Sequence, residues 1–301
     1  MMKKKLSILE TAAAVAAFAV LPAAFTSCSD DDGAGGGGAS APALTVSVAD
    51  GGGNVPLAEG ATAGIFAVND TGGVEALATV TALQGGLLAG ADSVEAAMHD
   101  GVLLCAFSPA GLYTAETYGR PVLFSVQADQ STEAAYTASD LMMSPLTAVT
   151  GGRAALVMSH VMAKVTVHIT DVTGHYDLSA LKMTMPGRLT TVSADIAQGA
   201  ATTVEGTVAD MTPYCPGNTA YRATGTAIVA PGTVGGGAEL VSVHIGGETF
   251  AYSLSSSVDW EAGKEYVYTM RLTEEGLVPY SSSVNDWEEG DAGLSGDALP
   301  A

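Results

Sequence analysis

The chain has 301 residues, of which 48% are hydrophobic and only 14% charged, and it contains 37 glycines. This length allows one large domain or two of ordinary size, and the abundance of small residues favours short strands and turns over long helices. A formal net charge of −21 at pH 7 would repel nucleic acid and anionic membrane surfaces, so we expect no nucleic-acid partner.

Residues 1–27 are typical of a bacterial export signal. Three consecutive lysines precede an apolar stretch, Ala12 to Phe25, which is too short for a convincing membrane-spanning helix. The stretch ends at Ser27 and Cys28, which resemble the cleavage site of a lipoprotein signal, where the cysteine is lipidated and becomes the new N-terminus. An ordinary signal peptide with a chance cysteine is the alternative. Removing three lysines and Glu10 from 11 basic and 32 acidic residues leaves 8 and 31, a net charge of −23.

Residues 28–43 combine an acidic run, Asp30 to Asp32, with a tract of Gly, Ala and Ser. No core can form from this composition, so we expect a flexible tether. An acidic run directly after a lipidated cysteine resembles the surface-export signal of some bacterial lipoproteins, whereas a solvated charge cluster is the alternative. We therefore expect an outer-membrane lipoprotein at the cell surface, attached through the lipid on Cys28.

Residues 44–150 carry alternating, β-branched runs that predict an N-terminal β-sandwich. Leu44 to Val48 is the first expected strand, and a short helical turn is expected near residues 93–99. Gly151-Gly152 marks the expected domain boundary. The other strands are expected at 63–68, 74–83, 102–107, 121–127 and 139–143.

Residues 151–301 predict a second, C-terminal β-sandwich. The clearest strand is 155–170, in which odd positions from Val161 to Ile169 are apolar and even positions are mostly polar, as expected for one continuous strand with one buried face. Gly246-Gly247 lies between two alternating runs and predicts a hairpin. The other strands are expected at 180–186, 188–197, 202–208, 223–230, 238–246, 248–255, 264–273 and 278–287.

No motif for catalysis, phosphate binding or metal binding occurs, so we predict no enzyme, no cofactor and no metal site. His160, Lys164 and His168 share the polar face of strand 155–170, but along one strand the two histidines would be roughly 26 Å apart, too far to hold one ion. We interpret them as a solvated or sheet-packed polar face.

The cysteines and tryptophans also favour structural roles. Cys105 lies in an apolar run and predicts a buried thiol, whereas Cys215 lies in a loop, and we expect no disulfide between them. Trp260 and Trp287 stand beside acidic residues at expected strand ends, where structural anchoring is favoured over stacking on a ligand.

Short motifs spread over most of the chain resemble the fimbrillin family, the lipoprotein pilins of Bacteroidetes-type bacteria. Each motif alone is weak, and their order and spacing carry the resemblance. They are Asp129-Gln130-Ser131 with Tyr136, Ser139-Asp140-Leu141, Ser159 to Val165, Ala230-Pro231-Gly232, Ala262 to Tyr268 and Asn285-Asp286-Trp287.

The resemblance implies two transthyretin-like β-sandwich domains and assembly by β-strand exchange. In polymerising members of the family, a surface protease cuts after an arginine and removes the first strand, and an extended strand from a neighbouring subunit fills the groove. Here the first strand corresponds to Leu44 to Val48. The candidate donor strand is the segment Val278 to Trp287, with Val278, Tyr280, Val284 and Trp287 as its apolar side chains.

The chain departs from this pattern because no Arg or Lys occurs between Leu6 and Gly119. An arginine-directed protease therefore has no site next to the first strand. The leading hypothesis is a structural or accessory subunit of a surface fimbria with a role in adhesion, whose partners are other fimbrial subunits. The alternative is a non-polymerising surface lipoprotein, either a pilus anchor or a lone adhesin that binds a host glycan or protein.

Overall fold

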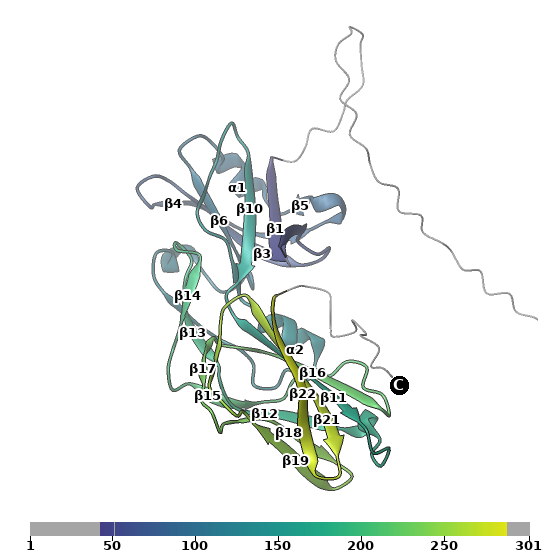
Figure 1. The fold of residues 1–301 in the computed structure, drawn as a ribbon. Coiled ribbons are helices and arrows are strands. Elements are labelled where there is room, and N and C mark those ends of the chain that lie inside the picture. Colours follow the sequence, from purple (N-terminus) through teal and green to yellow (C-terminus); the bar gives the residue numbers. More distant parts are fainter. Residues whose placement is uncertain (1–42, 51, 288–301) are drawn as a thin grey trace, which may run out of the picture. The chain divides into compact units, whose positions relative to one another are not determined.

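A computed structural model describes residues 43–50 and 52–287 of the chain (Figure 1). The prediction of an all-β fold is confirmed, because strands dominate and the α-helices α1 (Asp92–Ala97) and α2 (Glu133–Ala138) have only six residues each. Within the described residues, no helix has the length and apolar character needed to cross a membrane. The division into two transthyretin-like domains at residue 150 stays a prediction.

Nine strands form the first sheet, in the order β2-β1-β10-β8-β6-β3-β4-β5, with β9 paired to β6. Strand β1 lies inside this sheet, parallel to β10 and antiparallel to β2. The nine strands are β1 (Leu44–Asp50), β2 (Gly53–Pro56), β3 (Thr62–Val68), β4 (Val74–Ala82), β5 (Leu88–Ala89), β6 (Leu103–Ser108), β8 (Met142–Met143), β9 (Thr147–Ala148) and β10 (Ala154–His160).

Two four-stranded sheets follow, in the orders β16-β11-β21-β22 and β15-β12-β18-β19. The first of these consists of β11 (Ala163–Asp171), β16 (Arg222–Val229), β21 (Lys264–Thr273) and β22 (Gly276–Asp286), the last described strand. The second consists of β12 (Lys182–Leu189), β15 (Val208–Met211), β18 (Glu239–Ile245) and β19 (Glu248–Ser253).

Smaller elements complete the fold. Strand β7 pairs with β13, so the hydrogen-bonded sheets cross residue 150 of the chain. The remaining strands are β7 (Val122–Ser125), β13 (Thr191–Asp195), β14 (Ala200–Thr203), β17 (Gly232–Val234) and β20 (Val258–Trp260). The short 3-10 helices are η1 (Gln84–Gly86), η2 (Ala115–Thr117) and η3 (Leu178–Ala180).

Apolar side chains gather in two core clusters. Strand β3 contributes to both, because successive side chains of a strand point to opposite faces: Ile65 belongs to one cluster and Phe66 to the other. The larger cluster also takes Val165 from β11 and Val243 from β18, which joins the two four-stranded sheets through one core. Each fully buried aliphatic side chain contributes about 1.5–3 kcal/mol of burial free energy.

The predicted continuous strand 155–170 is wrong, because two strands occupy this range. Strand β10 ends at His160, β11 begins at Ala163, and the two belong to different sheets. At the break, Val161 N–H donates to the carbonyl of Leu141, and the carbonyl of Met162 accepts from Gly263. The chain changes hydrogen-bonding partners here inside the apolar run Val161-Met162-Ala163, so the sequence pattern alone does not reveal the break.

The prediction that this range buries only one face is also wrong. The odd positions from Val161 to Ile169 are buried as expected, but Lys164 is 4% exposed and Thr166 is 1% exposed on the opposite face. The sheet of β11 is thus covered on both sides around these residues, and the polar side chains there are buried rather than solvated.

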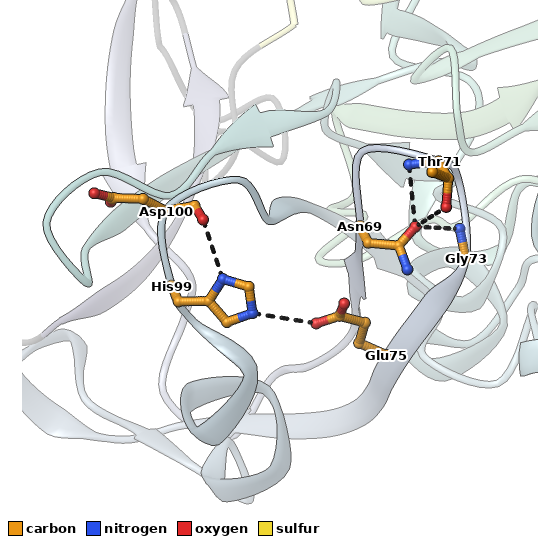
Figure 2. Close-up of polar contacts among 6 residues, drawn as sticks. All are labelled: Asn69, Thr71, Gly73, Glu75, His99 and Asp100. Atoms are coloured by element: carbon orange, nitrogen blue, oxygen red, sulfur yellow. Dashed lines mark hydrogen bonds and ion pairs between the residues drawn. The ribbon is translucent and has the colours of Figure 1, made fainter.

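Two β-hairpin turns are formed by residues suited to tight turns. The β18–β19 hairpin predicted at Gly246-Gly247 is confirmed, since Ile245 pairs with Glu248 and both glycines have positive φ, 62° and 86°. In the β3–β4 turn, Asn69 Oδ1 accepts hydrogen bonds from Thr71 and Gly73 (Figure 2).

Figure 2 also shows how the segment after α1 lies against β4. His99 Nε2 lies 3.7 Å from the Glu75 carboxylate, and its Nδ1 lies 3.1 Å from the carbonyl of Asp100. Because the His99 side chain is 66% exposed, we assign this pair little weight in stability and no function.

Candidate assembly site

The C-terminal strand β22 is an edge strand. It pairs with β21 in an antiparallel ladder that runs from Lys264 opposite Asp286 to Thr273 opposite Gly276, with an irregularity opposite Thr269 and Met270. Among the described strands, none pairs with β22 on its other side. An edge strand presents unpaired backbone groups and is the element that another chain can replace or extend.

Strand β22 exposes three large apolar side chains among polar ones. Val278, Tyr280 and Val284 are 43%, 49% and 58% exposed. Val284 stands opposite Tyr266, a buried residue of β21, so its side chain lies on the core-facing side of the sheet although it is not covered. The Arg271 guanidinium lies 3.9 Å from the centre of the Tyr280 ring.

The end of β22 is anchored by Trp287. This indole is 4% exposed and stacks flat on the His160 ring, with 4.1 Å between the ring centres and 3° between the planes. Its backbone N–H donates to the carbonyl of Gly263 at 3.0 Å. Contacts on both the backbone and the ring therefore hold this strand end against β10.

Buried polar groups surround the anchor. His160 Nδ1 lies 2.9 Å from Asp140 Oδ1, and within the described part of the chain its buried Nε2 has no hydrogen-bond partner. Lys164 Nζ lies 3.4 Å from Glu265 Oε2 and 5.9 Å from the Trp287 ring. Each buried charge therefore has an opposite group nearby, as burial requires.

Strand β1 is also firmly built into the fold. Leu44, Val46 and Val48 are 2%, 4% and 0% exposed, and they belong to the smaller core cluster. Its neighbours β2 and β10 both pair with it, so its removal would leave β2 without a partner and open a groove along β10, which would keep its pairing with β8.

The first and last described strands, β1 and β22, approach each other at one cavity. A cavity of about 420 Å³ is lined by Ala49, Asp50 and Asn54 from the β1–β2 region and by Asp286 and Trp287 from the end of β22. His160 lies between them in its wall. The arrangement brings the two strands together although they are more than 200 positions apart in sequence.

The residues predicted from sequence divide into three groups. Val278, Tyr280, Val284 and Trp287 all lie on or directly after β22, but only the first three are exposed. Ser27 and Cys28 lie outside the described residues. The burial of Trp260 and Trp287, at 3% and 4% exposure, confirms that both serve as structural anchors.

Cys105 is buried as predicted, and burial raises the pKa of its thiol to about 12. Burial likewise raises the pKa of Cys215 to about 11, and both cysteines are free. Sequence reasoning gave no role to Asp140 and Glu265 as partners of His160 and Lys164, although all four lie within the quoted motifs. The quoted motifs thus contain all four residues, but which of them pair depends on the break between β10 and β11.

Comparison with known proteins identifies the family. A family profile described as fimbrillin-like matches residues 57–287. A comparison with curated proteins finds no match.

Among solved structures, a proposed cell adhesion protein from Bacteroides ovatus is 14% identical, with a TM-score of 0.65 over 82% of this chain and 98% of that one. A second, from Bacteroides uniformis, is 19% identical, with a TM-score of 0.56 over 81% of this chain and 96% of that one. The tip fimbrial protein Mfa3 from Porphyromonas gingivalis is 10% identical, with a TM-score of 0.49 over 76% of this chain and 95% of that one.

At these identities, the first two structures establish a shared fold and no more. The family profile covers both four-stranded sheets and the Trp287 anchor. The chain therefore belongs to the fimbrillin-like family.

Proposed function

We propose that the protein is a structural or accessory subunit of a cell-surface fimbria, that it has a role in adhesion, and that it assembles with other fimbrial subunits by β-strand exchange. The observation that carries this proposal is the form of β22: it is the last described strand of the chain, it lies at a sheet edge, and it exposes Val278, Tyr280 and Val284. A strand of this kind can leave β21 and fill the groove of a neighbouring subunit, where its apolar side chains would find cover.

Export as an outer-membrane lipoprotein belongs to the same proposal. It rests on the sequence around Cys28 and on the acidic tether that follows. A lipid on Cys28 would hold the folded part at the membrane by way of residues 29–43, a spacing that suits a subunit near the base of a fibre.

A second candidate is a non-polymerising anchor or adhesin, which two observations favour. No Arg or Lys occurs between Leu6 and Gly119, so an arginine-directed protease has no site beside β1. The β1 side chains Leu44, Val46 and Val48 are buried between β2 and β10, and retention of this strand would keep the acceptor groove closed.

Mass spectrometry of protein sheared from the cell surface distinguishes the two candidates. A subunit that accepts a neighbour's strand would lack Leu44 to Val48 and would copurify with other fimbrial proteins. An anchor would retain these residues beside lipidated Cys28 and still copurify with fimbrial proteins. Recovery of an intact chain with no fimbrial protein would contradict a place in a fimbria and favour the lone adhesin.

A further inference from the structure

A cavity of about 900 Å³ lies between α2 and the sheet that contains β11. Its walls come from four parts of the chain: helix α2, the segment 57–62, the pair Ser108-Pro109 and the loop around Tyr214. Lys164, Thr226 and Trp287 line it from the sheet side. Volumes of this size are typical of sites for small molecules.

Two aromatic rings stack on each other in the wall of the cavity, and the outer face of this stack is called the platform below. Tyr136 and Tyr214 stack with 5.5 Å between ring centres and 26° between planes, and both are half-buried. Tyr136 lies on α2, whose first turn is capped by the Thr132 side chain. Tyr214 is fixed by two backbone hydrogen bonds of 2.8 Å with Thr226. Both rings are therefore positioned by backbone structure before any ligand enters.

Two of the charged groups in the cavity wall, Lys164 and Asp140, already have partners. Lys164 pairs with Glu265, and Asp140 pairs with His160. The remaining acid, Glu133, lies on the exposed first turn of α2. An anionic ligand would meet acidic side chains and no uncompensated cation, in a chain of net charge −21. The cavity therefore suits a neutral ligand.

Polar groups distributed over the same walls favour a ligand with many hydroxyl groups over a purely apolar one. Thr62, Ser108, Thr137 and Thr226 all line the cavity, interspersed with apolar surface from Leu57, Met142 and the prolines. An extended peptide fits less well, because peptides are held by backbone bonds to a free sheet edge, and the walls here are mostly a helix and loops.

We propose that this cavity binds a neutral oligosaccharide. The apolar face of a pyranose ring lies on the Tyr136–Tyr214 platform, and its hydroxyl groups bond to the threonine and serine side chains around it. This deepens the adhesive role in the proposed function by assigning it a site and a class of ligand. The platform itself contains no residue of β22, and a subunit that keeps β22 in place also keeps Trp287 in the cavity wall.

An array of neutral and sialylated oligosaccharides tests the assignment with the purified folded protein, followed by calorimetry on the tightest neutral binder. We expect Tyr136→Ala and Tyr214→Ala each to weaken binding at least tenfold. Tyr221→Ala is the matched control, because that tyrosine is 73% exposed and lies outside the cavity; it should bind like the wild type.

Thr137→Arg tests binding without endangering the fold. Thr137 is exposed, and a larger side chain there fills the cavity without removing core contacts. It should abolish binding while the circular dichroism spectrum stays unchanged. The assignment is overturned if no neutral oligosaccharide binds, if only sialylated glycans or peptides bind, or if the cavity variants bind like Tyr221→Ala. Fibre incorporation is measured separately, so a failure of strand exchange would leave this result unaffected.

Discussion

Trp287 anchors the end of the last described strand by a flat contact of its ring with His160 and by a backbone hydrogen bond to Gly263. Its ring covers the His160 ring, and Nδ1 of His160 faces the Asp140 carboxylate. Three buried side chains from different parts of the chain therefore hold one another in place. Removing the indole leaves a cavity and also uncovers a polar ring that is otherwise shielded.

We expect Trp287→Ala to lower the free energy of unfolding by about 3–5 kcal/mol, the usual cost of deleting a buried tryptophan side chain. Trp287→Phe retains a ring over His160 and should lose less than half of that. Urea unfolding followed by circular dichroism measures both. Equal losses for the two variants would show that the stacked contact does not hold the strand end.

Asp171, at the end of β11, provides a pH-dependent contribution to stability. Burial tends to raise the pKa of its carboxyl, but hydrogen bonds from the Thr173 hydroxyl and from the backbone N–H groups of Thr173 and Tyr176 outweigh burial and lower it. A carboxyl with a lowered folded-state pKa stabilises the fold above its unfolded pKa, and this stabilisation is lost as the pH falls through the folded pKa.

The stability difference between wild type and Asp171→Ala should therefore be largest near neutral pH and shrink as the pH falls below about 4, the ordinary range of an aspartate. Urea unfolding at a series of pH values measures it. Asp177→Ala, in a separate turn, is the comparison. Hydrogen bonds from the Ser179 hydroxyl and backbone N–H also lower the pKa of the Asp177 carboxyl, but that carboxyl is exposed. A difference for Asp171→Ala that grows toward low pH would contradict the account.

Among the elements, β1 carries the question of maturation. It lies between β2 and β10, and alternate side chains fill the smaller core cluster, so the strand is a structural part of the described fold rather than a loosely attached leader.

Val48→Ala should lower the free energy of unfolding by about 2 kcal/mol, because Val48 is fully buried and the neighbouring strands limit collapse around the cavity. Thr45→Ala, on the other face of the same strand, should change it by less than about 1 kcal/mol. Denaturant unfolding of the two variants checks this. Equal small effects would show that β1 adds little to the fold and is free to leave.

The sequence predicts individual strands well where a strand has its own turn signals. Gly246-Gly247 identifies the β18–β19 hairpin, because two residues with positive φ are what a tight hairpin turn requires. The alternation around Tyr266 and Met270 likewise identifies β21, because one face of that strand packs into the core.

The sequence does not show where the chain passes from one sheet to another. The break at Val161-Met162 lies in a run of apolar residues that continues into Ala163, so hydrophobicity does not mark it, although the buried positions are even-numbered in β10 and odd-numbered at the end of β11. Helix α2 was missed because six residues give less than two helical turns of pattern. The sequence leaves open whether His160 and Lys164 lie on a solvated or a sheet-packed polar face, because their burial depends on Asp140, Glu265 and Trp287, which only the tertiary fold brings to them.

On the scale of the whole molecule, strand exchange requires β22 to give up its ladder with β21. The ladder is regular from Lys264 opposite Asp286 to Thr269 opposite Ser281, and the exposed pair Lys264–Asp286 adds a contact of 2.6 Å at one end. Donation therefore costs the subunit these bonds and the Trp287 anchor, and a neighbouring subunit's groove must restore equivalent ones.

A reversible lock on β22 tests donation in cells. Val267 and Ser283 stand directly opposite each other in the ladder, so Val267→Cys with Ser283→Cys places two thiols where a disulfide closes across the strands. The single variants Val267→Cys and Ser283→Cys are the controls. We predict that the oxidised double variant reaches the cell surface but is absent from sheared fimbriae, and that reduction restores it. Incorporation of the locked protein at the level of the single variants would contradict donation of β22.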